Sequence, residues 1–337
     1  MPALNDLLDS LLGGQDMDER TAAGLVRELA SGNVEPVLAG ALLAALRAKG
    51  ETPEEIRGLA SGMRGLAVDP GIAPELGAVD VVGTGGDGSG SLNLSTGSAL
   101  LAAACGVPVV KHGNRSVSSR SGSADVLEAL GMTLPPGPEE ARAMVERTGF
   151  TFLFAPHFHP AMKAVVPVRR AMGVRTAFNI LGPLTNPAAP PYLLLGAFSP
   201  EMAELMARAV AGGGVRRAWL VHGEPGWYEA TPVGEFLVFE SENGEFRRRT
   251  RDPSEWGVER CTADDLAGGD ARDNAARLQA VLEGREQGPH RDALVLGAAL
   301  VLELTGRTGP GEPAAAAASR AIDDGRGAAL LASLRSG

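Results

Sequence analysis

From Val79 onward, short runs of β-branched residues alternate with Ala- and Leu-rich stretches of helical length. Strands are expected over 79–82, 107–110, 152–154, 192–197 and 218–221, and helices over 95–104, 124–130 and 200–212. Parallel strands need long crossover connections, so this alternation predicts an α/β fold with a mainly parallel central sheet flanked by helices. The stretch 234–250 is instead typical of a hairpin that turns at Asn243-Gly244. From Asp270 the chain is expected to be helical again.

The first part of the chain has no strand signal. Leu8, Leu11 and Leu12 begin a pattern of apolar residues at helical spacing that continues to about residue 68. Thr52-Pro53-Glu54-Glu55 is typical of a helix start, because Thr52 can cap the helix and Glu55 completes a capping box. We therefore expect a small N-terminal domain of four helices, with Asp69-Pro70-Gly71 as a hinge to a larger α/β domain.

Charge and composition exclude several classes of protein. The formal net charge of −10 argues against binding nucleic acid through its backbone, which needs a basic face. The two cysteines, Cys105 and Cys261, have no zinc or disulfide-scaffold spacing. The longest nearly apolar run, 99–110, is too short to cross a membrane, and Met1–Asp6 has no basic segment typical of a signal peptide. We expect a cytoplasmic protein that contacts neither nucleic acid nor membrane.

The first polar loop follows the expected strand 79–82. It holds five glycines within Gly83–Gly90 and leads through Asn93 into a helix that begins near Ser95. Backbone N–H groups in such a loop, together with a helix N-terminus, can cradle phosphate oxygens. Asp87 would repel a bare phosphate, so it indicates a bridging cation, or a hydrogen bond to a sugar or an ammonium group.

The second polar loop, Lys111–Asp125, also follows a strand and precedes a helix. Its basic and hydroxyl side chains are those that a polyanion needs. Open α/β sheets bind ligands at the carboxyl ends of their strands. Two phosphate-type loops on neighbouring strands therefore predict a ligand with more than one phosphate.

A third segment, 156–187, carries His157, His159 and the arginines Arg169, Arg170 and Arg175. On a strand the two histidines would share a face, but no third ligand has suitable spacing, so zinc is not favoured. The arginines supply positive charge for a carboxylate or a phosphate, although Arg170 is more typical of a solvated helix surface.

These motifs resemble the anthranilate phosphoribosyltransferase family, which has the nucleoside phosphorylase class III fold. The resemblance rests on Gly83–Asp87, Asn93–Thr96, Lys111–Ser119, His159–Met162 and Gly173–Pro187, and it runs nearly end to end. It implies a helical domain of residues 1–70, joined by part of 160–185, and an α/β domain of residues 71–337 that binds 5-phosphoribosyl 1-pyrophosphate (PRPP). It also implies transfer of the phosphoribosyl group to the amine of anthranilate with release of pyrophosphate, one or two Mg²⁺ ions, a role in tryptophan biosynthesis, and a homodimer through the helical domain.

The resemblance also implies site residues. Those around PRPP are Gly83, Gly86, Asp87, Ser91, Asn93, Leu94, Ser95, Thr96, Lys111, His112, Gly113, Asn114, Arg115, Ser116, Val117, Ser118, Ser119 and Ser123. Those along the path of anthranilate are Gly83, His112, Asn114, His159 and Arg169, with Arg169 reaching the carboxylate. Ser95 and Glu229 would hold magnesium.

One position departs from the family pattern. The family's second metal site uses an adjacent Asp-Glu pair after a His-Gly turn, whereas this chain has Tyr228-Glu229 after His222-Gly223. A phenol is a poor ligand for magnesium, which prefers carboxylate, carbonyl and water oxygens. Glu229 with waters can suffice, Glu224 can substitute from the turn, or the second metal is weak or absent.

Other functions stay open at this point. A pyrimidine nucleoside phosphorylase shares the fold and a phosphate loop, although Gly83–Gly90 and Asn186-Pro187 favour the transferase. A catalytically weakened homologue with another acceptor, or a non-catalytic one that binds nucleic acid or a regulatory ligand, would explain Tyr228. The chain has no added amidotransferase domain, so association with anthranilate synthase would be a non-covalent complex. No nucleophilic side chain is expected, since positioning and electrostatics suffice for displacing pyrophosphate.

Overall fold

The computed structural model describes residues 2–116, 120–309 and 312–336. The chain begins with the four predicted helices, α1 (Leu4–Leu12), α2 (Glu19–Ser31), α3 (Pro36–Lys49) and α4 (Pro53–Arg64). The capping box at α4 is confirmed, because Glu55 N–H donates to Thr52 Oγ1 (3.2 Å) and Thr52 N–H donates to Glu55 Oε2 (2.9 Å).

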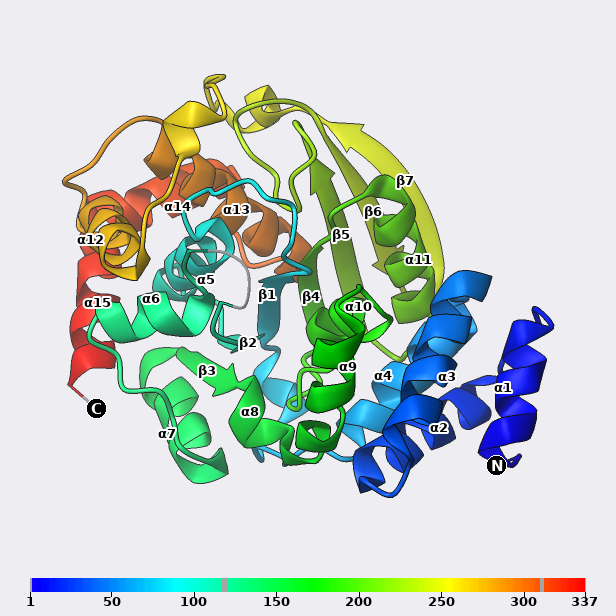
Figure 1. Ribbon diagram of the computed structural model, residues 1–337. Helices are drawn as coiled ribbons and strands as arrows, with labels where there is room; N and C mark the ends of the chain where they lie inside the picture. Colours follow the sequence, from blue (N-terminus) through cyan, green and yellow to red (C-terminus); the bar gives the residue numbers. More distant parts are fainter. Residues whose placement is uncertain (1, 117–119, 310–311, 337) are drawn as a thin grey trace.

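The rest of the chain is built on one seven-stranded sheet of order β3-β2-β1-β4-β5-β6-β7 (Figure 1). Its strands are β1 (Val79–Gly83), β2 (Val109–Gly113), β3 (Phe150–Phe154), β4 (Tyr192–Gly196), β5 (Arg217–Gly223), β6 (Phe236–Glu242) and β7 (Glu245–Arg251). Neighbours from β3 to β5 are parallel, which confirms the mainly parallel sheet.

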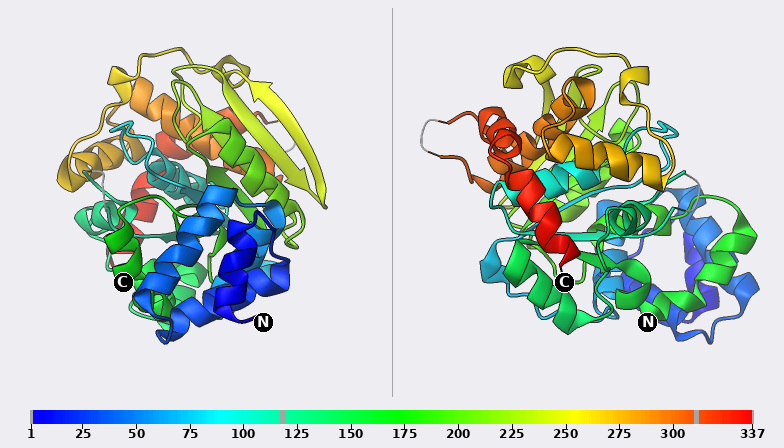
Figure 2. Two further views of the ribbon diagram at one scale, coloured as in Figure 1. Left: turned by 45° about the vertical axis from the view of Figure 1, so that its right-hand side comes forward. Right: turned by 90° about the vertical axis from the view of Figure 1, so that its left-hand side faces the viewer.

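The predicted hairpin is also confirmed. Strands β6 and β7 are antiparallel, and β7 forms the outer edge of the sheet (Figure 2). Asn243 and Gly244 connect them with φ angles of 51° and 84°. Positive φ at both turn residues is what a two-residue hairpin turn of type I′ requires.

Helices cover both faces of the sheet. They are α5 (Leu94–Ala104), α6 (Ser123–Ala129), α7 (Pro138–Thr148), α11 (Pro200–Ala211), α12 (Ala271–Leu282), α13 (Pro289–Thr305), α14 (Ala314–Asp323) and α15 (Arg326–Arg335). Leu194 faces the cluster built with α5 and α13, whereas Leu193 and Leu195 face the cluster built with α11 and the N-terminal helices. This alternation along β4 explains why the strand is apolar throughout.

The segment 155–184 differs from the sequence interpretation. It forms the short elements α8 (Ala155–Phe158), η2 (Pro160–Ala164), α9 (Val166–Met172), α10 (Phe178–Leu181) and η3 (Gly182–Leu184). His157 and His159 therefore do not share the face of a strand: His157 is exposed and stacks edge-on against Phe154, while His159 is buried. Contacts of η2 with α2 and of α9 with α3 place this segment against the N-terminal helices (Figure 1).

The chain order creates a switch point between β1 and β4. From β1 the chain moves outward to β2 and β3, then returns to β4 on the other side of β1. Crevices at such points, outside the carboxyl ends of the strands, are where open α/β sheets bind ligands. Gly83 and Gly196 end the two strands as register partners, so this edge holds two adjacent residues without side chains.

In the described part of the chain, no helix combines the length and the apolarity that crossing a bilayer requires.

Candidate active site

The glycine-rich loop Gly83–Gly90 leaves β1 at this switch point. Gly85, Gly86, Gly88 and Gly90 have φ angles between 62° and 77°, a conformation that other residues adopt only at a cost. Thr84 N–H donates to the Gly196 carbonyl (2.9 Å) at one end of the loop. The Gly90 carbonyl accepts from Gly268 N–H (2.8 Å) at the other. The sequence therefore requires glycine here for backbone geometry as well as for close approach of a ligand.

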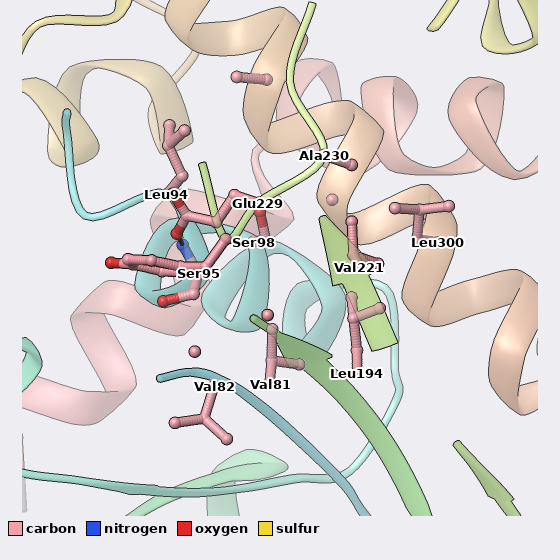
Figure 3. A pocket seen from close by; sticks show the side chains of 15 residues that line it. Val81, Val82, Leu94, Ser95, Ser98, Leu194, Val221, Glu229, Ala230 and Leu300 are labelled. Carbon is pink, nitrogen blue, oxygen red and sulfur yellow. Dashed lines mark hydrogen bonds between the residues drawn. The ribbon is translucent and has the colours of Figure 1, made fainter. Parts of the chain in front are cut away.

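Ser95 and Glu229, which are 134 residues apart, meet beside this loop (Figure 3). Ser95 N–H donates to Glu229 Oε1 (2.9 Å) in the first turn of α5. Both residues line a pocket with Gly83, Ser98 and Tyr228. The second oxygen, Glu229 Oε2, is buried without a hydrogen-bond partner among the described residues. A buried carboxyl oxygen left in this state fits a ligand that brings a cation or a hydrogen-bond partner.

Two carboxyl groups set the charge of the pocket. Burial raises the pKa of Glu229 to about 8, and repulsion from Asp87 adds to the effect, whereas the Ser95 N–H group and Lys111 oppose it. Asp87 is fixed by Ser89 N–H on Oδ1 (3.0 Å) and by Tyr228 N–H on Oδ2 (3.3 Å). The side chain of Asp87 thus ties the glycine loop to the segment that carries Glu229.

The oxygen atoms of Ser95, Glu229 and Asp87 are suitable ligands for a magnesium ion that binds together with a phosphate. Carboxylate and hydroxyl oxygens are hard ligands, and Mg²⁺ is commonly held by one or two carboxylates together with substrate phosphates and water. Within the described ranges, no group of three or more His, Cys, Asp or Glu residues could hold a metal alone. Ser95 and Glu229, with Asp87 nearby, could therefore hold Mg²⁺ only together with oxygens from a ligand.

Tyr228 fills the space above the switch-point glycines. A Cβ atom on Gly83 would come within 2.5 Å of Tyr228 Cε2 and closer still to Cδ2, and one on Gly196 would collide with the Tyr228 carbonyl. The charge of Glu229 and then burial raise the pKa of Tyr228 well above its usual value, so the phenol stays protonated. A neutral phenol is a poor ligand for a hard cation such as Mg²⁺.

Glu224, the other candidate metal ligand, lies in the connection after β5. Its side chain packs against Gly234, where an added Cβ would lie 2.9 Å from Glu224 Oε2. It is not among the residues that line the pocket of Ser95 and Glu229.

Lys111 lies inside the sheet, whereas the sequence interpretation put it at the start of the polar, anion-binding loop that follows the strand. The strand β2 continues to Gly113, so Lys111 is 1% exposed and its ammonium donates to the Val81 carbonyl. Burial lowers the pKa of Lys111 to about 8, although the charges of Asp80 and Glu229 raise it. Lys111 therefore influences the pocket through its positive charge, which interacts with Glu229, and not through a hydrogen bond to a ligand.

Asp80 completes a buried polar network under the site. Its carboxyl accepts from His112 N–H (3.2 Å) and from Asn186 Nδ2 (2.8 Å), and Asn186 Nδ2 also donates to the Val110 carbonyl (2.8 Å). Burial raises the pKa of Asp80 to about 6 against the opposing charge of Lys111. The network fixes the backbone at the end of β2, from which the second loop starts.

Three of the residues predicted for the acceptor, His112, His159 and Arg169, lie in or against the segment 155–184, which packs on the N-terminal helices. The rings of His112 and His159 are 5.1 Å apart, and His112 Nδ1 is 3.2 Å from the Gly182 carbonyl. Burial lowers the pKa of His112 to about 3 and that of His159 to about 4, so both imidazoles are neutral. The Arg169 guanidinium lies 5.5 Å from the Phe178 ring, and burial lowers its pKa. Neutral rings and one half-buried cation suit an aromatic acid.

The second loop is held mainly by its own contacts. Arg115 pairs with Asp125 (3.0 Å) and Glu128 (2.6 Å), so its guanidinium already has carboxylate partners at the surface. Asn114 Oδ1 accepts from Arg115 N–H (2.8 Å). Ser123 Oγ donates to the Asn114 carbonyl (3.3 Å), and Gly113 lies so close that an added Cβ would be 2.5 Å from Ser123 Oγ.

Other predicted residues connect the two loops. Asn93 Nδ2 donates to the Ser121 carbonyl (3.2 Å), and Asn274 Nδ2 donates to Asn93 Oδ1 (2.8 Å). Ser91 Oγ lies 3.1 Å from Ser89 Oγ. Leu94 and Thr96 are buried in the first turn of α5, and the Ser116 N–H group donates to Asp125 Oδ2 (3.1 Å). Val117, Ser118 and Ser119 lie outside the described residues.

Three features were missed from the sequence. The ring of Tyr228 packs on Gly83, Asp80 joins Lys111 in a buried network, and Arg175 Nη2 donates to the Gly86 carbonyl (2.5 Å). A carboxylate in the apolar run 79–82 was a usable signal for Asp80. Tyr228 and Arg175 were singled out for other reasons, but nothing in the sequence indicated their contacts with Gly83 and Gly86.

Comparison with known proteins gives the class first. Residues 5–67 match the helical bundle domain of a glycosyl transferase family, and residues 75–328 match the a/b domain of that family. An anthranilate phosphoribosyltransferase of Methylorubrum extorquens is 46% identical, over 99% of this chain and 98% of the relative. Among solved structures, the crystal structure of the Thermus thermophilus anthranilate phosphoribosyltransferase superposes with a TM-score of 0.89 at 44% identity, covering 98% of this chain and 99% of that one.

A more distant structure is informative about ligands. The Saccharomyces cerevisiae anthranilate phosphoribosyltransferase, in complex with PRPP and Mg, has a TM-score of 0.81 and 26% identity, over 99% of this chain and 93% of that one. This chain belongs to the anthranilate phosphoribosyltransferase family of glycosyl transferases.

Proposed function

We propose that this protein transfers the phosphoribosyl group of PRPP to the amine of anthranilate and releases pyrophosphate. The single observation that carries the proposal is the meeting of Ser95 and Glu229 beside the glycine-rich loop at the β1–β4 switch point. The relatives that share the fold over almost the whole chain bear this activity in their names. The phosphorylase alternative has no comparable support.

The residues act by binding and orienting both substrates. The glycine loop and the second loop hold the donor's phosphates, and magnesium, when bound with the donor, would stabilise the charge that develops on the leaving pyrophosphate. Arg169 holds the carboxylate of anthranilate, and the neutral His112 and His159 line its path. The aromatic amine of anthranilate is uncharged at pH 7, so its lone pair attacks C1 of the ribose without a strong base. Positioning then supplies most of the rate.

We propose that Glu229, with water and donor phosphates, replaces the family's carboxylate pair. The protonated phenol of Tyr228 occupies the place next to it and adds no negative charge. The measurement is the number of Mn²⁺ ions bound per chain in the presence of pyrophosphate, followed by electron paramagnetic resonance. Tyr228→Asp should add one ion, and an unchanged number would contradict this assignment.

The homodimer is proposed through the N-terminal helices and α9. Among the described residues, the large apolar side chains that are exposed are Leu12 (68%), Val37 (86%), Val166 (45%) and Val174 (53%), and all lie on or beside α1, α3 and α9. Light scattering should give twice the chain mass, and Val37→Lys should lower it. The cytoplasmic location, the boundary near residue 70 and a complex with anthranilate synthase stay predictions.

Anthranilate is fluorescent, so its loss in the presence of PRPP tests the function directly. We expect saturable consumption that depends on both PRPP and magnesium. Replacing PRPP with inorganic phosphate and a pyrimidine nucleoside tests the phosphorylase. Folded protein that binds PRPP without consuming anthranilate would instead indicate another acceptor or a catalytically weakened homologue.

A further inference from the structure

Arg175 lies where three parts of the molecule meet. Its Nη2 donates to the Gly86 carbonyl in the glycine-rich loop (2.5 Å), and its guanidinium carbon lies 4.6 Å from the centroid of the Phe198 ring after β4. Its backbone carbonyl accepts from Arg47 Nη1 on α3 (2.6 Å). Arg175 thus connects the glycine-rich loop, the segment after β4 and the N-terminal helices.

The glycine loop is shaped around this guanidinium. Gly86 has a φ of 77°, and a Cβ there would lie 2.7 Å from Arg175 Nη2. By contrast, no heavy atom lies within 4 Å of the Cβ positions of Gly85, Gly88 and Gly90. Arg175 therefore contacts the loop from outside at the one glycine of this group that has a close neighbour.

The backbone of Arg175 is also coupled to the acceptor side. Gly173 ends α9, the helix of Arg169, with a φ of 64° and an N–H bond to the Arg169 carbonyl (3.3 Å). On the other side, the buried Thr176 donates its N–H to Asn179 Oδ1 (2.9 Å) at the start of α10. Arg175 lies between these two hydrogen-bonded points, three residues after the end of α9, so its backbone position depends on where α9 ends.

We propose that Arg175 is a positioning residue that couples occupancy of the acceptor site near Arg169 to the position of the phosphate-binding glycine loop. The proposal rests on the proposed function. Coupling between two sites is reciprocal, so an anion on the glycine loop should change the affinity for anthranilate, and anthranilate should change the affinity for the anion equally. The planar guanidinium suits this role because it donates to Gly86 while stacking on Phe198, which a lysine cannot do together.

The test measures binding without turnover. Anthranilate is titrated by its fluorescence with and without magnesium pyrophosphate, a probe of the glycine loop that carries no transferable ribose. We expect the wild-type Kd for anthranilate to fall at least about fivefold with pyrophosphate. In Arg175→Ala the change should be less than about twofold, and Arg175→Lys should lie between. Arg170→Ala, an exposed neighbour on α9, should behave as wild type.

Three results would overturn the proposal: no change of Kd in the wild type, wild-type coupling in Arg175→Ala, or equal loss in Arg170→Ala. Arg175 is exposed, so its replacement opens no buried cavity, and the lysine variant provides a second test that keeps the charge. Failure of the proposed function is distinguishable, because it appears as absent PRPP-dependent consumption of anthranilate by the wild type.

Discussion

Replacing Gly83 with Ala tests the placement of Tyr228. The added Cβ would lie 2.5 Å from Tyr228 Cε2 and 3.1 Å from Cγ, whereas carbon atoms in ordinary contact are ~3.5–4 Å apart. Because Cδ2 lies closer still, the ring must retreat by more than about 1 Å. It cannot do so freely, because the Tyr228 N–H group is bonded to Asp87 and its carbonyl lies against Gly196. Overpacking of this kind costs about 1–3 kcal/mol of the free energy of unfolding.

Urea denaturation followed by tryptophan fluorescence measures this cost. The Gly83→Ala substitution is made in the wild type and in Tyr228→Ala and Tyr228→Phe backgrounds. Tyr228→Phe keeps the ring, so the cost should remain. With Tyr228→Ala the space is open, and alanine in a strand should be neutral or stabilise by ~0.5–1 kcal/mol relative to glycine. An equal cost of Gly83→Ala in all three backgrounds would refute the reasoning, because it would place the strain elsewhere than at the ring.

Three further results are expected. Arg169→Ala should raise the KM for anthranilate at least about tenfold in steady-state assays, because a charge-assisted bond contributes ~1.5–3 kcal/mol, and an equal rise in the KM for PRPP would contradict the assignment. Lys111→Met should lower the free energy of unfolding by about 3–5 kcal/mol, since it leaves buried carboxylates unpaired, and Asp80→Asn in the same chain should restore part of it. The pKa of Asp80 rises from 3.8 to about 6 on folding, so the native state holds a proton that the unfolded state loses. Wild-type stability relative to Asp80→Asn should therefore fall by about 2 kcal/mol between pH 4 and pH 6 in urea titrations, out of about 3 kcal/mol over the whole titration, and a rise would show the opposite sign.

The sequence predicted the elements whose periodicity is long enough to read. The four N-terminal helices, the capping box at Thr52, the parallel strands and the Asn243-Gly244 hairpin are all confirmed. The helical elements between 155 and 184 were not predicted, because each is seven residues or shorter. An apolar pattern needs two or three turns before a helical period can be distinguished.

The ends of the strands were also predicted poorly, and for β2 this led to a wrong position for Lys111. The apolar run stops at Val110, so the sequence ended the strand there, whereas β2 continues to Gly113. A buried lysine such as Lys111 can be placed inside a strand only when the acidic residue that compensates its charge is known. Asp80 stands on the neighbouring β1, and the two charges compensate each other across the sheet. Such a pair depends on register, which single-sequence patterns do not determine.

The position of Tyr228 could not be derived from the sequence either. The pairing of Ser95 with Glu229 followed from the family resemblance, and the structure brings these residues together. The phenol fits because Gly83 and Gly196 are register partners on β1 and β4, a relation that arises only because the order of strands reverses at the switch point.

The basic residues near the site divide into fixed and exchangeable charges. Lys111 is buried and its ammonium is bonded to the Val81 carbonyl, so it stabilises an anion through its field and remains where it is. Arg115 pairs with Asp125 and Glu128 at the surface, where such pairs contribute only ~0–1 kcal/mol each. A phosphate competes for that guanidinium at little cost. Arg115 can therefore leave its carboxylate partners and bind a phosphate directly. Lys111 instead contributes a fixed positive electrostatic potential to the pocket, whether or not a ligand is bound.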